Sequence, residues 1–174
     1  DNAESHPMTV AAGLIGLAQA LSKQGLDLKD FTTDQPALKA WIASMARQAA
    51  EEIMDETRPV GKRQRAARLL SLEPFDAANA AMLHLLSPAV APELQQTALE
   101  VLGGYREPAV ADKIIGVWPS LTPALREKTA TLLLARTDRI AKLLDAIESR
   151  KITPAQLSAA AKATLGRQKN PVLA

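Results

Sequence analysis

The apolar residues of this 174-residue chain recur three or four positions apart through most of its length, which is the spacing of one face of an α-helix. Between about Gln35 and Glu56 an apolar stripe is opposed by a charged face, on which Arg47 and Glu51 form an i,i+4 pair. We predict a helix here with its charged face in solvent, begun by Asp34 as N-cap and by Pro36 in the first turn. The stripe consists of Leu38, Trp41, Ile42, Met45, Ala49 and Ile53.

An apolar stretch from Met8 to Ala18 lies in a second predicted helix, from about Pro7 to Lys23, with Gly25 as its C-terminal stop. The stretch is shorter than the about 20 residues that a membrane-spanning helix needs. It also lacks the preceding Lys or Arg of a secretory signal peptide. We therefore expect a buried helix here, followed by a loop that reaches the next helix.

Beyond Pro59 the chain repeats itself at a constant spacing, and prolines mark nearly the same rhythm at positions 92, 123 and 154. Each unit has the pattern of two helices joined by a short turn. One such hairpin cannot bury its apolar faces alone, so neighbouring hairpins must stack and share a core. Five equally spaced columns carry the repeat: Ala66, Ala98 and Ala130; Leu69, Val101 and Leu133; Leu70, Leu102 and Leu134; Met82, Ile114 and Ala146; Leu83, Ile115 and Ile147.

These patterns predict an all-α fold, a right-handed α-α superhelix of helical hairpins. Residues 1–57 form an N-terminal helical pair, packed as a cap or an irregular repeat. Residues 58–174 form about three hairpins (59–87, 91–118 and 122–150) and the start of a fourth, with a helix over 154–165. The ending Asn170-Pro171-Val172-Leu173 is similar to Glu107-Pro108-Ala109-Val110, which opens the second helix of a repeat. We therefore expect the chain to be a piece of a longer protein.

Composition supports helices and excludes several classes of protein. The strongest helix formers, Ala and Leu, together make up a third of the chain, whereas Phe, Tyr and Trp are scarce. The absence of cysteine excludes a disulfide framework, thiolate zinc sites, iron–sulfur clusters and covalent haem attachment. The 21 basic and 19 acidic residues leave a formal net charge of +2, which is not the strong basic excess of a nucleic-acid-binding protein.

Several motifs resemble those of known repeat proteins. The acidic-Pro-x-Val motif at Glu107–Val110 and the Ala-x-x-Leu/Val-Leu columns resemble HEAT-type repeats of the short variety. The segments Trp118–Pro123, Leu143–Glu148 and Lys151–Leu157 are similar to one group of large bacterial multidomain proteins, described as membrane-bound dehydrogenases with a C-terminal haem-binding domain. The resemblance covers about Val60 to Leu165.

The resemblance implies a place within a larger protein. In that group a β-propeller similar to sugar dehydrogenases precedes the HEAT-like region, and a c-type cytochrome domain follows it. It therefore implies an extracytoplasmic location, periplasmic or secreted, with haem only in a neighbouring domain and no cofactor in this chain. Because this sequence contains neither a Cys-x-x-Cys-His motif nor a strand-rich region, none of that group's functional residues has a counterpart here. The sequence alone indicates no compartment.

One cluster of cations is a candidate contact for an anion or a partner, because no acidic residue interrupts it between Thr57 and Leu72. Binding of a nucleic-acid backbone would require matching cations in the later repeats, and the aligned positions there are mixed in charge. We therefore favour a solvated helix face whose charges offset the acidic residues just upstream. The cluster consists of Arg58, Lys62, Arg63, Arg65 and Arg68.

The remaining polar residues indicate no catalytic, cofactor-binding or metal site. The two histidines, His6 and His84, lie on different predicted helices, and His84 has no ligand partner four residues away. No arrangement supplies a nucleophile, a base and an orienting group together. We interpret Glu52, Asp55 and Glu56 as a solvated helix end, Gly103-Gly104 as a helix terminus, and Trp41 and Trp118 as core residues.

The sequence thus predicts a non-enzymatic scaffold or protein-interaction segment of a larger protein, which the resemblance places in the redox class. Its partners would be neighbouring domains of the same polypeptide or another protein. One alternative is a nucleic-acid-binding protein of the HEAT-type DNA glycosylase class, which steep salt-dependent binding to duplex DNA would favour. Another is a freestanding adaptor for protein interactions. Physical reasoning supports only the scaffold role, because stacked hairpins form an extended surface without a catalytic cleft. The redox class depends on the resemblance alone.

Overall fold

Helices make up the described chain. The computed structural model describes residues 2–26 and 28–167, with the side chains of residues 9–22, 24–26, 28 and 30–167. No strand occurs in these ranges, which confirms the all-α prediction. Short 3₁₀ turns follow three of the helices: η1 (Leu70–Leu72), η2 (Trp118–Ser120) and η3 (Pro154–Gln156). The α-helices are α1 (Asn2–Gln24), α2 (Leu28–Thr32), α3 (Pro36–Met54), α4 (Val60–Leu69), α5 (Phe75–Leu85), α6 (Pro92–Gly104), α7 (Ala109–Val117), α8 (Pro123–Leu134), α9 (Thr137–Glu148) and α10 (Ala159–Arg167).

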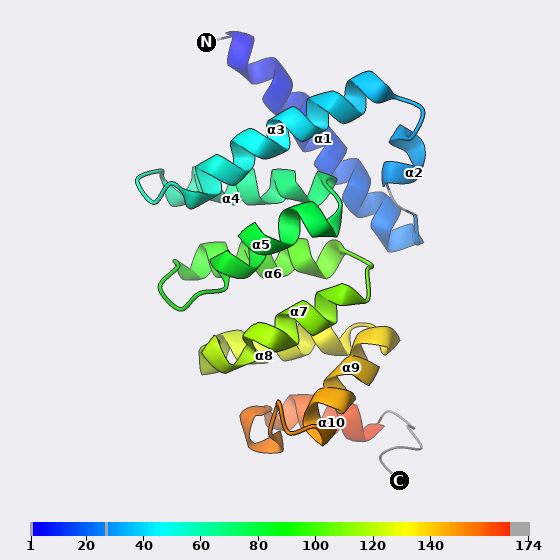
Figure 1. The fold of residues 1–174 in the computed structure, drawn as a ribbon, viewed down its shortest axis with the longest axis vertical. Helices are drawn as coiled ribbons and strands as arrows, with labels where there is room; N and C mark the ends of the chain where they lie inside the picture. Colours follow the sequence, from blue (N-terminus) through cyan, green and yellow to red (C-terminus); the bar gives the residue numbers. More distant parts are fainter. Residues whose placement is uncertain (1, 27, 168–174) are drawn as a thin grey trace.

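From α3 onward the helices alternate between two layers. Helices α4, α6, α8 and α10 contact one another in succession and form what we name the even layer. Helices α3, α5, α7 and α9 do the same and form the odd layer, which faces the viewer in Figure 1. Helices α1 and α10 lie at opposite ends of the long axis of the molecule (Figure 1). From α3 onward, each helix therefore packs against the helix two places later in the chain.

Small buried residues recur in the helices of the even layer. Ala66 in α4, Ala98 in α6 and Ala130 in α8 are at most 1% exposed, and they are equally spaced along the chain. Leu102 in α6 and Leu133 in α8 are fully buried. Burial of one such Leu side chain stabilises the fold by roughly 1.5–3 kcal/mol. One continuous apolar cluster extends from Ala46 in α3 to Leu165 in α10.

Polar contacts join successive hairpins. The hydroxyl of Tyr105, just after α6, donates a hydrogen bond of 2.6 Å to the carbonyl of Leu70 in η1. The Tyr105 ring packs edge-to-face on Phe75, with ring centroids 5.4 Å apart. The Gln64 amide of α4 donates to the Thr97 hydroxyl of α6 over 3.0 Å. These contacts join α4 and η1 to α6 and to the residue that follows it.

The N-terminal region differs from its sequence prediction in two ways. The expected loop after α1 contains α2, and the residue before α3 that caps it is Gln35 rather than Asp34, with no side-chain cap. Pro36 does lie in the first turn of α3, as predicted. The expectation of a buried first helix is wrong, because Val10 and Leu17 are 46% and 48% exposed.

Helix ends at glycine and proline follow the sequence more closely. Gly25 has φ of +89° and ends α1 as a Schellman motif, in which the Leu26 amide donates to the Leu21 carbonyl over 2.9 Å. The helix expected over 154–165 is divided: η3 occupies its start, and α10 begins only at Ala159. None of the described helices is both long and apolar enough to cross a membrane.

Candidate interaction surface

The predicted cation cluster does not share one surface. Lys62 and Arg65 are exposed on α4, whereas Arg63 between them is only 7% exposed. The Arg63 Nε donates a 2.9 Å hydrogen bond to the carbonyl of Ile53, in the last turn of α3. Arg63 is therefore a structural residue that joins α4 to the end of the preceding helix, and its side chain is withdrawn from any external anion.

The other two members of the cluster have acidic partners. Arg58 Nε lies 3.2 Å from Asp55 Oδ2 in the loop between α3 and α4. Arg68 Nη2 lies 3.6 Å from Glu100 Oε2 on the neighbouring helix α6. Both pairs are about half exposed, so each contributes little to stability. With Arg63 buried, Lys62 and Arg65 are the exposed cations of the cluster that pair with no described carboxylate.

The contact made by Arg63 recurs along the even layer. Gln95 in α6 donates through Nε2 to the Ser87 carbonyl over 2.8 Å, and Arg126 in α8 donates through Nε to the Trp118 carbonyl over 3.2 Å. These three donors are nearly equally spaced along the chain, and each lies in the first turns of its helix, shortly after a proline. Each one satisfies a carbonyl at or just beyond the end of the preceding odd-layer helix, where intrahelical partners run out. The prolines in the sequence could have indicated where these donors lie. The donors were missed because they differ in residue type, two being Arg and one Gln.

Arg139 of α9 is the most deeply buried cation among the described residues, at 2% exposed. Its Nη2 donates to the carbonyls of Gly103 and Tyr105, at the C-terminal end of α6. Its Nε is buried without a partner in the described chain. Burial lowers the pKa of the Arg139 guanidinium, the nearby Arg136 lowers it further, and Asp138 opposes both effects. No signal in the sequence distinguishes this arginine from its neighbours.

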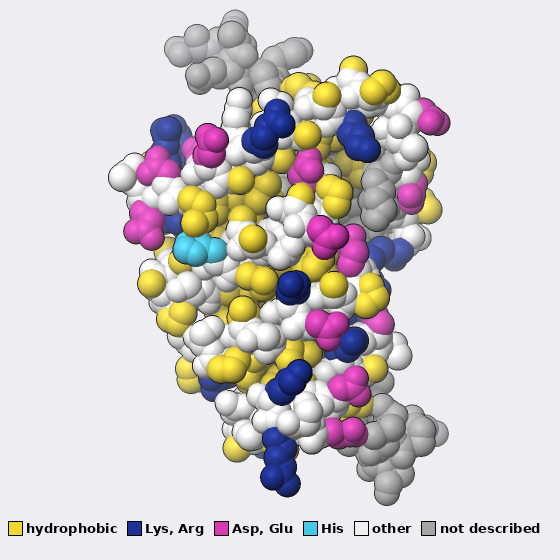
Figure 2. Space-filling model, viewed as in Figure 1, with side chains coloured by type: hydrophobic (Ala, Val, Ile, Leu, Met, Phe, Trp, Pro, Cys, Tyr) yellow, Lys and Arg dark blue, Asp and Glu magenta, His cyan; other side chains and the backbone are white. Residues whose placement is uncertain are grey.

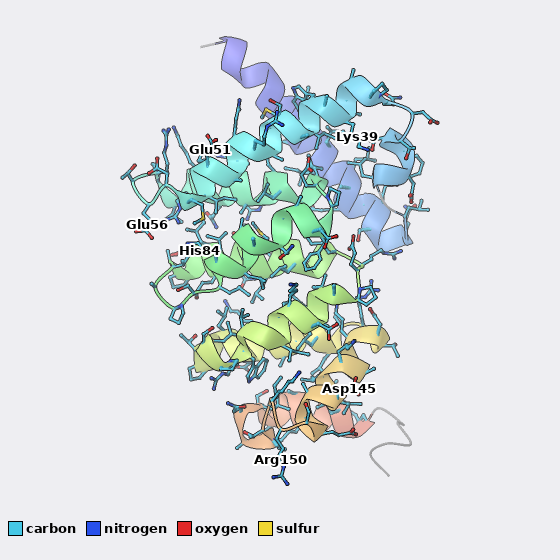
Figure 3. The ribbon with its side chains drawn as sticks, viewed as in Figure 1. Lys39, Glu51, Glu56, His84, Asp145 and Arg150 are labelled. Carbon is cyan, nitrogen blue, oxygen red and sulfur yellow. The ribbon has the colours of Figure 1, made fainter. Side chains whose placement is uncertain are left out.

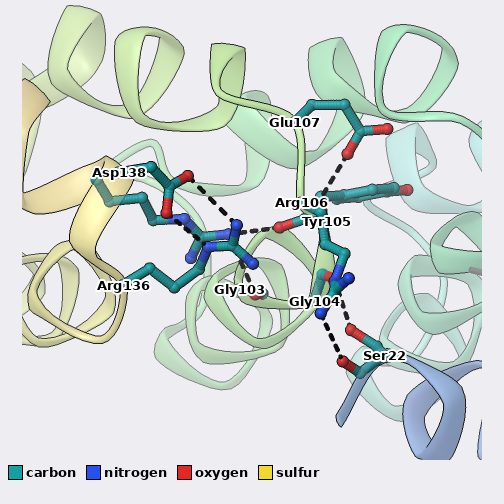
Figure 4. A network of polar contacts seen from close by, with 9 residues as sticks. Ser22, Gly103, Gly104, Tyr105, Arg106, Glu107, Arg136 and Asp138 are labelled. Carbon is teal, nitrogen blue, oxygen red and sulfur yellow. Dashed lines mark hydrogen bonds and ion pairs between the residues drawn. The ribbon is translucent and has the colours of Figure 1, made fainter. Parts of the chain in front are cut away.

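A second arginine network holds α1 against the stack. Arg106 donates to the carbonyls of Ser22 and Gly25, at the end of α1, while the Ser22 hydroxyl donates to the Gly104 carbonyl over 3.1 Å (Figure 4). The Glu107 carboxylate accepts from the Arg106 amide over 2.9 Å. A hollow of about 100 Å³ lies beside these contacts, between α1 and η1. It is small for an organic ligand.

A larger hollow of about 410 Å³ opens between α6 and α8 on the even layer. Its floor includes Leu99 and Leu132, and Lys128 and Arg136 lie on its rim together with the buried Arg139. We name this hollow the α6–α8 groove. Its full lining is Gln96, Leu99, Glu100, Gly103, Lys128, Thr131, Leu132, Ala135, Arg136 and Arg139.

The remaining candidate residues form no reactive cluster. His84 is exposed on α5, at the same edge of the molecule as Glu56 (Figure 3), and His6 lies among the residues whose side chains are not described. Hydrogen bonds from the Thr57 hydroxyl and amide hold the pKa of Asp55 below its usual value. Trp118 is fully buried, as predicted. No group of three or more metal-ligating side chains occurs within the described residues.

Charge is mixed over the odd layer as well. Figure 2 shows acidic and basic side chains interspersed over the face formed by α3, α5, α7 and α9, with hydrophobic side chains between them. Lys142 and Asp112 form one such pair, at 3.2 Å, between α9 and α7.

Comparison of this chain with family models, with curated proteins and with solved structures found no match.

Proposed function

We propose that this chain is a right-handed α-α superhelix of HEAT-like hairpins, and that it serves as a non-enzymatic scaffold or protein-interaction segment of a larger protein. The observation that carries the proposal is the pattern of helix contacts, in which each helix of a layer packs on the next helix of the same layer. A stack of this kind offers long, continuous surfaces to a partner and needs no reactive centre to do so.

Two periodic features support the repeat interpretation. The alanines at 66, 98 and 130 occupy the same buried place in three successive even-layer helices. The donors at 63, 95 and 126 make the same contact with the end of the preceding helix. Random Ala- and Leu-rich helices would share the first feature by composition, but they would not share the second.

The distribution of charge favours a protein partner over nucleic acid. A phosphate backbone requires a continuous run of cations, because each neutralised phosphate adds to affinity. On the even layer Glu93, Glu100 and Glu127 stand among the cations, and Arg63 is buried. We therefore place the HEAT-type DNA glycosylase class second.

The redox class of the larger protein rests on the resemblance of the segments Trp118–Pro123, Leu143–Glu148 and Lys151–Leu157 alone. In this proposal the helical stack spaces a dehydrogenase domain from a cytochrome domain in an extracytoplasmic compartment. The neighbouring coding sequence tests this part directly. A propeller-like region upstream and a Cys-x-x-Cys-His segment downstream would support it, whereas their absence would favour the freestanding adaptor.

The scaffold role can be tested by site-specific photocrosslinking in the native host. A photoreactive residue is placed at Thr131 on the even layer in one variant and at Lys113 on the odd layer in another, both positions being exposed. We expect crosslinks to protein, either to another domain of the same polypeptide or to a second chain, concentrated on one layer. Crosslinks to nucleic acid alone, or to nothing at either position, would contradict the proposal.

A further inference from the structure

The α6–α8 groove is a wide, open depression on the even layer. Its volume of about 410 Å³ lies within the range of roughly 300–1,000 Å³ common to small-ligand sites in proteins. Leu99 and Leu132 provide an apolar floor, and Gly103 lies beside Leu132, where an added Cβ atom would make an ordinary contact with Leu132 Cδ1 at 3.7 Å. The groove is therefore a preformed depression between two packed helices.

Arg139 gives this groove a buried positive charge. The residue is 2% exposed and contacts two backbone carbonyls, but it makes no ion pair within the described chain, and its Nε donor is unsatisfied. Burial of this cation is costly even with Asp138 nearby, because carbonyl dipoles replace only part of its lost hydration. An anion at the groove would offset that cost.

The rest of the rim is also cationic. Lys128 is exposed on α8 and makes no ion pair with a described residue, while Arg136 is paired with Asp138 through Nε at 3.0 Å (Figure 4). The one carboxylate in the lining, Glu100, is already engaged by Arg68 from α4. Three cations thus line the groove against a single carboxylate. The groove also reaches the N-terminus of α9, where Asp138 in the first turn offsets the charge of Arg136.

We infer that the α6–α8 groove binds an acidic segment of a partner protein, with a carboxylate of Asp or Glu held between Lys128, Arg136 and Arg139 and apolar neighbours of that residue on Leu99 and Leu132. This inference rests on the proposed function, because it names the partner chemistry of the interaction segment. A peptide fits better than a nucleic acid, since the cations of the groove are not continued along the even layer, where Glu93, Glu100 and Glu127 are exposed.

A library of random short peptides displayed on phage provides the probe, with the full 174-residue chain as the immobilised target. We expect enriched peptides to carry Asp or Glu beside an apolar residue. Exchange of that acid for its amide in a synthetic peptide should weaken binding about tenfold, the effect of losing one charge-assisted contact. Lys128→Glu should weaken binding to a similar or greater degree. The matched control Lys113→Glu reverses an exposed charge on the opposite layer and should leave binding unchanged.

Several outcomes would overturn the inference. These are enrichment of peptides without acidic residues, equal effects of Lys128→Glu and Lys113→Glu, or no enrichment at all. If the chain retained duplex DNA and Lys128→Glu abolished that retention, the ligand of the groove would be nucleic acid and not a peptide. Each of these outcomes differs from failure of the proposed function, because the photocrosslinking at Thr131 and Lys113 detects a protein neighbour whatever the chemistry of the groove.

Discussion

Comparing the stability of Arg63→Ala with that of Arg65→Ala distinguishes a structural arginine from an exposed one on the same helix. Arg63→Ala removes the donor of the 2.9 Å bond to the Ile53 carbonyl and the aliphatic stem that packs between α3 and α4. Ile53 is fully buried, so water replaces the lost donor poorly. Arg65→Ala removes the same charge from an exposed position on α4.

The magnitude follows from the two environments. An acceptor left unsatisfied in the interior costs about 1–3 kcal/mol. Part of that cost is offset, because Arg63 Nη2 is itself buried without a partner in the described chain and this donor disappears with the side chain. We therefore expect a net loss of about 2 kcal/mol for Arg63→Ala, a fall in Tm of roughly 4–8 °C for a chain of this length. Arg65→Ala should change stability by less than about 0.5 kcal/mol.

Chemical and thermal unfolding followed by far-UV circular dichroism measure both variants. Arg63→Gln is the informative control, because Gln95 makes the equivalent contact with an amide over 2.8 Å. We expect Arg63→Gln to retain most of the stability that Arg63→Ala loses. Equal destabilisation by Arg63→Ala and Arg65→Ala, or a larger effect of Arg65→Ala, would refute the assignment of Arg63 as the residue that joins two helices.

Three further changes test other parts of the fold. Tyr105→Phe removes the 2.6 Å bond to the buried Leu70 carbonyl and should destabilise by about 1–3 kcal/mol in urea unfolding. Arg150 has φ of 60°, so Arg150→Gly should raise the Tm by roughly 1–4 °C, and a decrease would contradict left-handed strain there. Arg136 holds the pKa of Asp138 below its usual value, so Arg136→Gln should raise that pKa in a carboxyl NMR titration. The pair should stabilise the fold above pH about 4, and this stability should be lost as the pH falls through the lowered pKa of Asp138.

Sequence periodicity predicted those parts of the fold that local patterns control. The stripe of α3 was predicted correctly, because Ile42, Ala49 and Ile53 are buried while Lys39 and Glu51 on the opposite face are exposed. Helix ends at Gly25, at Gly104 and at the evenly spaced prolines depend on backbone chemistry that a single residue determines. Such features can be predicted without knowledge of tertiary contacts.

Features that depend on tertiary contacts were missed. The central stretch of α1, from Met8 to Ala18, has apolar residues on all sides, so its periodicity could not indicate that only Ala11 among the described side chains of the helix is buried. Helix α2 is too short for periodicity to detect, and its Asp and Thr residues favour turns. The role of Arg63 was hidden because a list of charges does not indicate which helix end a long side chain reaches. The α6–α8 groove was missed for the same reason, since Arg139 lies far in sequence from Gly103.

Distances between spin labels test the layered stack most directly, and the absence of native cysteine makes pairs of introduced cysteines specific. Arg68, Glu100, Thr131 and Lys162 lie outside the buried core on α4, α6, α8 and α10 in turn. Packed helices lie roughly 8–10 Å apart, so labels at 68 and 162 should be separated by about three such steps and labels at 68 and 131 by about two. A 68–162 distance no longer than the 68–131 distance would show helices gathered around a common centre and would contradict the stacked arrangement.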